Sequence, residues 1–245
     1  MHRFHCPELK DAGSVVKIHS KKEIHHLKNV LRLKVGEAIS IFDGKGLNAT
    51  GTILSLEKEG ADIQIDSYQL PDEKKITVTL ACAIPKRAKF ETIIEKTTEL
   101  GVDEIIPLIT KRTEFSAPLD KLHKKNFRYQ TVAVNAAKQS QRKTIPIIHP
   151  ITLLKNALNL LQKDDLALMP CLTGQRKRLA DLFLGDKIQT QRIVYFIGPE
   201  GDFTDEEVIL AKAKGCIPIT LGETVLKVDT AAIAVLSFIR LATRE

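Results

Sequence analysis

The sequence lacks long hydrophobic runs and closely spaced cysteines. No uncharged apolar stretch approaches the roughly eighteen residues that a membrane helix needs, and the start of the chain is polar, so neither a membrane span nor an export signal is expected. Cys6, Cys82, Cys171 and Cys216 lie far apart and form no C-x-x-C pair, which argues against a zinc or redox motif. These absences predict a cytoplasmic protein with reduced thiols and no metal.

Familiar phosphate-binding and hydrolytic signatures are missing as well. The glycines of residues 44–51 fit neither the dinucleotide fingerprint nor the phosphate loop, and we interpret them as a hairpin turn. No Ser-His-Asp or Cys-His arrangement has a recognisable local context. The histidines near the start of the chain fit no metal pattern and are expected to be exposed or half-buried. They are His2, His5, His19, His25 and His26.

Positive charge is concentrated in the middle of the chain. The formal net charge is +7, and residues 74–143 hold fifteen Lys or Arg against seven Asp or Glu, whereas the flanking stretches 1–72 and 146–245 are balanced. A phosphate backbone would favour such a segment because each neutralised phosphate releases a counterion. The plainer alternative is a solvated helix face.

Residues 1–72 are predicted to form a small barrel, and its last residues belong to a predicted linker at 70–75. Strands are predicted at 15–18, 38–42, 50–56 and 61–64, because each short apolar run is bounded by glycine, aspartate or charged residues. One helix is predicted at 22–32, with Ile24, Leu27, Val30 and Leu31 at helical spacing.

Residues 73–245 alternate strands with helices, which predicts an α/β domain with a largely parallel sheet. The predicted strands are 78–84, 104–109, 166–172, 193–197 and 217–221. The predicted helices are 86–100, 120–139, 153–161, 204–214 and one that starts near Asp229 or Thr230. Buried helix positions are expected at Phe90, Ile93, Ile94, Thr97, Ile233, Leu236 and Ile239, and a capping box at Thr204 and Glu207.

Two strand-to-helix loops are the candidate ligand-binding elements. One contains Gly198, Pro199, Glu200 and Gly201, and ligands of open α/β sheets bind beyond the carboxyl ends of such strands. The other runs over 221–230 and carries Lys227 and Asp229 as opposite charges, and a third loop after Leu172 belongs to the same sheet edge. The alternatives are an ordinary turn whose glutamate favours a helix start, and a structural ion pair.

Five motifs stand in register along the chain: residues 26–32 with 42–44, residues 96–102 with 111–113, residues 136–142 with 145–146, and the loops at Gly198 and Leu221. In these motifs nearly the whole chain resembles the RsmE family of 16S ribosomal RNA uridine N3 methyltransferases, of the SPOUT class.

The resemblance implies an α/β protein with a PUA-like β-barrel at 1–72 and a SPOUT domain at 73–245 containing a parallel sheet and a deep trefoil knot. It further implies a homodimer packed across the knot, 16S ribosomal RNA of the small subunit as partner, and S-adenosylmethionine held by three loops. The implied cofactor-binding residues are Cys171, Leu172, Thr173, Ile197, Gly198, Pro199, Glu200, Gly201, Leu221, Gly222, Val225, Leu226 and Lys227.

For catalysis we expect Arg112, Arg142 or Lys227 to stabilise a developing uracil anion, and Glu200 or Asp229 to position the base or accept its proton. The chain departs from the family pattern at five positions. The family usually has Gly at Asp202, Arg at Lys227, Glu at Asp229, Glu at Lys138 and Gly at Gln141.

Two other functions stay open at this point. One is a non-catalytic ribosome-assembly factor that binds RNA without transferring a methyl group. The other is a methyltransferase of the same fold that acts on another RNA, such as transfer RNA.

Overall fold

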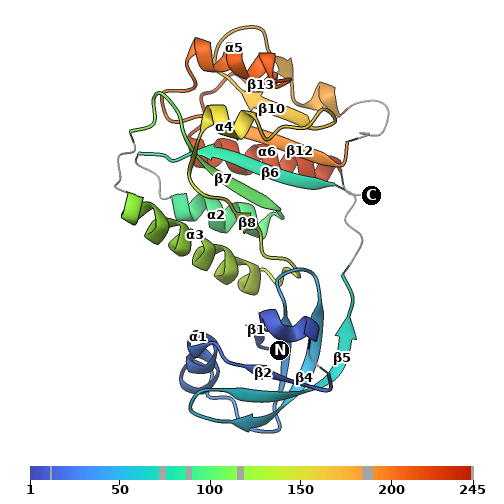
Figure 1. Cartoon of the computed structure of the whole chain (residues 1–245). Coiled ribbons are helices and arrows are strands. Elements are labelled where there is room, and N and C mark those ends of the chain that lie inside the picture. Colours follow the sequence, from blue (N-terminus) through green and yellow to red (C-terminus); the bar gives the residue numbers. More distant parts are fainter. Residues whose placement is uncertain (12, 72–75, 87–89, 115–118, 184–189, 244–245) are drawn as a thin grey trace. The chain divides into compact units, whose positions relative to one another are not determined.

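A computed structural model describes the chain except for residues 12, 72–75, 87–89, 115–118, 184–189 and 244–245 (Figure 1). Two compact units are present: Met1–Glu73 with Ala137–Ile145, and Lys74–Ala136 with Pro146–Glu245. Compared with the predicted domains 1–72 and 73–245, the first unit gains the short segment Ala137–Ile145. Most of the predicted linker lies outside the described residues.

The first unit is built on one curled five-stranded sheet (Figure 1). Its order is β1 (Arg3–His5), β3 (Ala38–Phe42), β4 (Asn48–Leu56), β5 (Ala61–Gln69) and β2 (Val15–Ile18). β1 runs parallel to β3 and the other pairs are antiparallel. Phe4, Ile41 and Ile63 are fully buried in its core, so the predicted β-rich unit and the hairpin turn between β3 and β4 are confirmed.

The predicted helix at 22–32 is shorter and less regular than expected. α1 (Lys21–His25) passes directly into a π-helical turn, η2 (His26–Val30), in which the backbone N–H of Leu31 donates to the carbonyl of His26. Ile24 and Leu27 are buried as predicted, but Val30 is 58% exposed. The wider turn shifts the helical phase, and the expectation that Val30 belongs to the apolar stripe was wrong.

The segment Ala137–Ile145 is fastened to the first unit by polar contacts. Lys138 forms an ion pair with Glu23 at 2.7 Å, and both side chains are largely buried. The guanidinium of Arg3 donates to the carbonyls of Gln141 and Arg142 at 2.7 Å each. Gln141 has φ 59°, a left-handed conformation in which glycine is more comfortable. These contacts hold the segment against α1 and β1.

The second unit contains an all-parallel eight-stranded sheet. Its order is β11 (Lys177–Arg178), β13 (Ile217–Thr220), β10 (Leu166–Pro170), β12 (Arg192–Ile197), β6 (Thr77–Ala83), β7 (Glu104–Ile109) and β8 (Ile147–Ile148), with β9 (Thr152–Leu153) also paired to β7. The five predicted strands are confirmed. The three missed strands have two residues each, too few for a periodic signal.

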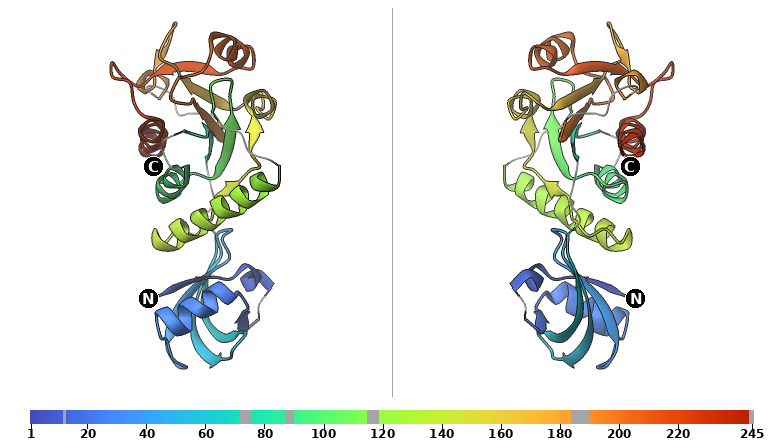
Figure 2. Two further views of the ribbon diagram at one scale, coloured as in Figure 1. Left: turned by 90° about the vertical axis from the view of Figure 1, so that its left-hand side faces the viewer. Right: turned by 90° about the vertical axis from the view of Figure 1, so that its right-hand side faces the viewer.

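Helices cover both faces of this sheet (Figure 2). α2 (Phe90–Glu99) and α6 (Val228–Ala242) pack together on one face, and α4 (Leu154–Leu158) and α5 (Asp205–Ala213) cover the other. The remaining helices are α3 (Leu119–Gln139) and two short 3-10 turns, η1 (Pro7–Asp11) and η3 (Ala180–Leu182).

The predicted apolar helix positions are nearly all buried. Phe90, Ile93, Ile94 and Thr97 of α2 and Leu236 and Ile239 of α6 lie in the interior. Ile233 is the exception, because Ala232 and Val235 occupy the centre of the buried stripe and leave it half-buried at the margin. Among the described residues, none of the helices combines the length and apolar character needed to cross a membrane.

Candidate functional site

Three loops meet at the carboxyl ends of neighbouring strands. β10 is paired on one side with β12 and on the other with β13, and all three strands run in the same direction. The loops that follow them therefore leave the same sheet edge, where open α/β sheets bind ligands. Between these loops lies a cavity of about 560 Å³, within the size range of small-molecule sites.

Most residues predicted to bind the cofactor line this cavity. They are Cys171, Leu172, Ile197, Gly198, Pro199, Glu200, Leu221, Gly222, Val225, Leu226 and Lys227. Thr173 and Gly201 belong to the same loops but do not line it. Asp229, predicted for catalysis, also lines the cavity.

Seven further residues line the cavity: Pro170, Arg176, Asp202, Thr220, Thr224, Val228 and Ala231. Of these, Arg176 and Thr220 lie outside the loops that the sequence analysis selected. Arg176 precedes the two-residue strand β11 and donates to the carbonyl of Cys171 at 3.0 Å. No local motif marks this arginine, because its placement depends on the pairing of β11 with β13.

Asp202 ties two of the loops together. Its Oδ2 accepts a hydrogen bond from the backbone N–H of Leu172, and its Oδ1 accepts one from the N–H of Phe203, each at 2.8 Å. Its own φ is 62°, and its N–H donates to the carbonyl of Pro199 at 2.9 Å. A tight turn thus places a carboxylate at the wall of the cavity.

Charged side chains of both signs surround the cavity. Glu200 accepts a hydrogen bond from the backbone N–H of Lys86 at 2.9 Å, so its carboxylate also links this loop to the end of β6. Lys227 is exposed at the position before α6, and Asp229 accepts from the N–H of Thr230 at 3.0 Å. These two charges are two residues apart at the start of α6.

Arg112 supports the Gly198 loop without lining the cavity. Its guanidinium donates to the carbonyls of Gly201 and Phe203. The backbone of the neighbouring Lys111 is also held, because its N–H donates to the carboxylate of Glu207 at 2.8 Å. Arg112 therefore holds the turn at Gly201 in place.

Arg142 belongs to the segment of the first compact unit. Its guanidinium donates to the hydroxyl of Thr144 at 2.9 Å, and its carbonyl accepts from Arg3. Arg142 is not among the residues that line the cavity of the second unit.

Cys171 is not a nucleophile at neutral pH. Burial raises the pKa of its thiol to about 12, and the negative charge of Asp202 acts in the same direction. Because the thiolate is the reactive form of cysteine, this side chain serves as a buried wall of the cavity. All four cysteines are free and buried.

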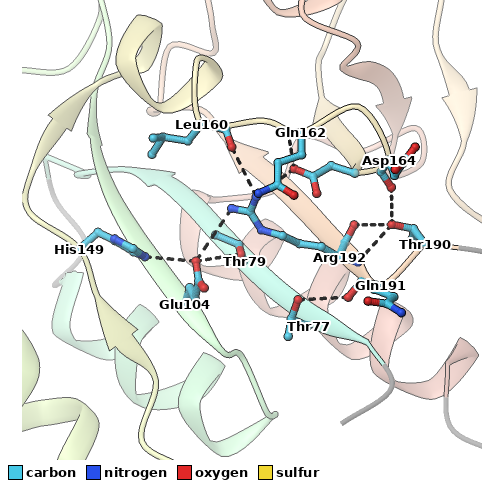
Figure 3. Close-up of polar contacts among 11 residues, drawn as sticks. Thr77, Thr79, Glu104, His149, Leu160, Gln162, Asp164, Thr190, Gln191 and Arg192 are labelled. Atoms are coloured by element: carbon cyan, nitrogen blue, oxygen red, sulfur yellow. Dashed lines mark hydrogen bonds and ion pairs between the residues drawn. The ribbon is translucent and has the colours of Figure 1, made fainter.

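A second polar cluster lies at the opposite, amino ends of the strands (Figure 3). Arg192 pairs with Asp165 at 2.9 Å, and Glu104 accepts a hydrogen bond from His149 at 3.1 Å. Glu104 also lies 4.0 Å from Arg192. These contacts join the starts of β7, β10 and β12. The described residues contain no cluster of His, Cys, Asp or Glu that could hold a metal.

Two family models match separate parts of the chain. A family model described as an RNA methyltransferase domain matches residues 72–240, and one described as an RNA methyltransferase PUA domain matches residues 20–66. Ribosomal RNA small subunit methyltransferase E of Mesomycoplasma hyopneumoniae is 36% identical over 97% of this chain and 98% of its own length. The Synechocystis protein of the same name is 34% identical over 85% of this chain and 67% of its own length.

Solved structures show the same fold. Ribosomal RNA small subunit methyltransferase E from Neisseria gonorrhoeae, bound to S-adenosyl methionine, superposes with a TM-score of 0.87 at 30% identity, covering 98% of this chain and 97% of its own. A Legionella pneumophila protein in complex with the same cofactor has a TM-score of 0.86 at 30% identity, with the same coverage of both chains.

Proposed function

Because the chain belongs to the ribosomal RNA small subunit methyltransferase E family, we propose that it transfers a methyl group from S-adenosylmethionine to N3 of a uridine in 16S ribosomal RNA. The observation that carries the proposal is the cavity at the carboxyl ends of β10, β12 and β13, which lies within the part of the chain that matches the RNA methyltransferase domain. The small ribosomal subunit is the proposed substrate particle, and the cytoplasm the compartment.

The cavity suits a nucleoside with an amino-acid tail. Most of the residues that line it are apolar or glycine, and the charged ones are Arg176, Glu200, Asp202, Lys227 and Asp229. A Cβ atom at Gly198 would lie 3.2 Å from the ring of Phe203 and 3.3 Å from the carboxylate of Asp202. A side chain at this position would therefore crowd the turn that forms one wall. We assign adenosine binding to the backbone of the Gly198 and Leu221 loops. When bound, the cofactor supplies an electrophilic methyl group on a positively charged sulfur.

The chain's own residues have to align the uracil and help to remove its N3 proton. Alignment of two reactants alone can lower a barrier by roughly 7 to 11 kcal/mol. We assign stabilisation of the developing uracil anion to Lys227 and handling of the proton to Glu200 or Asp229, because these three residues are among those that line the cavity. Arg112 acts through the turn that it braces, and Arg142 is proposed to contact the RNA.

The decisive experiment is transfer of labelled methyl groups to small ribosomal subunits that lack the modification, followed by identification of the product nucleoside. Appearance of 3-methyluridine is the expected result. Transfer RNA serves as the competing substrate, and methylation of it instead would assign a different RNA. Absence of transfer with intact RNA binding would favour the assembly-factor alternative.

Variants of the cations test the residue assignment. Lys227→Ala should lower turnover by at least tenfold while cofactor affinity changes little, since the interaction strengthens only as charge develops. Lys227→Arg is the matched control that keeps the charge. If Lys227→Ala and Arg142→Ala both left turnover unchanged, the assignment of these residues would be wrong.

We further propose that the second unit contains a trefoil knot and that two copies of the chain form a homodimer packed across this knot. A second hollow adjoins the cofactor cavity and is lined by Leu172, Val225 and Phe238, among others. Val225 is 72% exposed and Leu172 46% exposed, as expected of a surface that a second copy covers. Sedimentation equilibrium should give the mass of two chains, and the mass of one chain at micromolar concentration would contradict the dimer.

A further inference from the structure

Asp202 contributes a fixed negative charge to the wall of the cofactor cavity. Its φ of 62° lies in the left-handed region, which aspartate and asparagine tolerate better than most residues. The turn that requires this angle is closed by the hydrogen bond from its N–H to the carbonyl of Pro199. The backbone therefore determines where the carboxylate points.

Both carboxylate oxygens are held by backbone donors. The N–H of Leu172 belongs to the loop after β10 and the N–H of Phe203 to the loop after β12, and each lies 2.8 Å from its acceptor oxygen. Hydrogen bonds to a charged acceptor are stronger than those between neutral groups. The carboxylate thus fastens the two loops to each other and is itself immobilised.

Within the described part of the chain, Asp202 forms no ion pair, although Arg176 lines the same cavity. Other acids of this domain, such as Asp103 and Asp165, are paired with arginines. A half-buried carboxylate in this position interacts with a charge in the cavity more strongly than it would in water.

The two forms of the cofactor differ at sulfur by one methyl group and one positive charge. S-adenosylmethionine carries a positive sulfonium, and S-adenosylhomocysteine, the product, has a neutral thioether. The amino-acid tail and the adenosine are the same in both. A fixed negative charge at the wall therefore favours the first over the second, whereas a purely structural clasp would favour both equally.

We propose that Asp202 sets the preference of this cavity for the positively charged cofactor over its neutral product, in addition to fastening the two loops. The inference rests on the proposed function, because it concerns the same cavity and cofactor. Its consequence for turnover is that the product is held less tightly than the reactant and leaves more readily.

Isothermal titration of the full-length protein with each ligand separately tests the proposal. Asp202→Asn keeps the left-handed turn and one acceptor oxygen but removes the charge. We expect the ratio of the dissociation constants for S-adenosylhomocysteine and S-adenosylmethionine to fall about three- to tenfold, the size expected for one partly screened charge pair. Asp205→Asn is the matched control, since Asp205 is exposed and outside the cavity lining, and it should leave the ratio unchanged.

Asp202→Gly separates the clasp from the charge. Glycine accepts the turn but offers no acceptor to Leu172, so both ligands should bind more weakly, amide hydrogen exchange at Leu172 should accelerate, and the ratio should match that of Asp202→Asn. Equal weakening of both ligands in Asp202→Asn, or no change of either, would overturn the proposal. Failure of the unsubstituted protein to bind either ligand would instead count against the proposed function.

Discussion

The charge of Glu104 makes the stability of the fold depend on pH. The hydrogen bond from His149 holds the pKa of Glu104 below its ordinary value of 4.5, and the charges of His149 and Arg192 act in the same direction, while burial opposes them. A carboxylate with a depressed pKa in the folded state stabilises the fold above its unfolded pKa. That contribution is lost as the pH falls through the folded pKa.

We therefore predict that Glu104→Gln destabilises the protein at pH 7 and that its difference from the unsubstituted protein shrinks as the pH falls below 4.5. Urea unfolding at a series of pH values measures this difference. Glu223→Gln, at an exposed loop position, is the control. A difference that stays constant from pH 7 to pH 3 would show that the charge of Glu104 is not the cause.

The start of α5 illustrates how one element positions the site. Thr204 accepts a hydrogen bond from the N–H of Glu207, whose carboxylate accepts from the N–H of Thr204 in return. The other oxygen of Glu207 accepts from the N–H of Lys111. This helix cap therefore also anchors the loop that carries Arg112, and through it the turn at Gly201.

Thr204→Ala should destabilise the second unit by about 1 kcal/mol, because the first turn of α5 loses its cap. Thr204→Ser keeps the hydroxyl and should stay within a few tenths of a kcal/mol of the unsubstituted protein. Thermal and urea unfolding provide the measurement. Equal stability of the alanine and serine variants would mean that the cap makes no net contribution.

On the scale of the whole molecule, the excess positive charge is carried by the middle of the chain. The described part of α3 exposes Lys124 and Arg128, with Phe127 77% exposed between them. Basic side chains around an exposed aromatic ring suit single-stranded RNA, which offers phosphates and stackable bases. Arg128 also pairs with Glu91 at 2.9 Å, so Lys124 is the clearer position to test.

RNA affinity should fall steeply with salt, and Lys124→Ala should weaken binding and reduce the slope of log affinity against log salt by about 1. Lys163→Ala, at an exposed position outside the basic segment, should leave the slope unchanged. Filter binding to a 16S RNA fragment between 50 and 300 mM salt, roughly the range in which counterion release dominates, measures both. An affinity that does not respond to salt would exclude this surface as the docking site.

Sequence alone determined the elements with repeated local signals. The pattern of apolar residues predicted β3, β7 and α2, and the spacing of Thr204 and Glu207 predicted the capping box of α5. Each of these elements is specified by residues close together in the chain. The same applies to the glycine-containing loop at Gly198, whose turn follows a buried strand. Family motifs in register supplied the expected activity.

Tertiary structure decided what depends on residues far apart in the chain. Arg176 reaches the cavity only because β11 pairs with β13, and Asp202 meets the N–H of Leu172 only because β10 and β12 are neighbours. The attachment of Ala137–Ile145 to the first unit likewise requires Arg3 and Glu23 from the start of the chain. Local propensity contains no information on such pairings, since the free energy that selects them comes from packing and hydrogen bonds formed after the chain has folded back on itself.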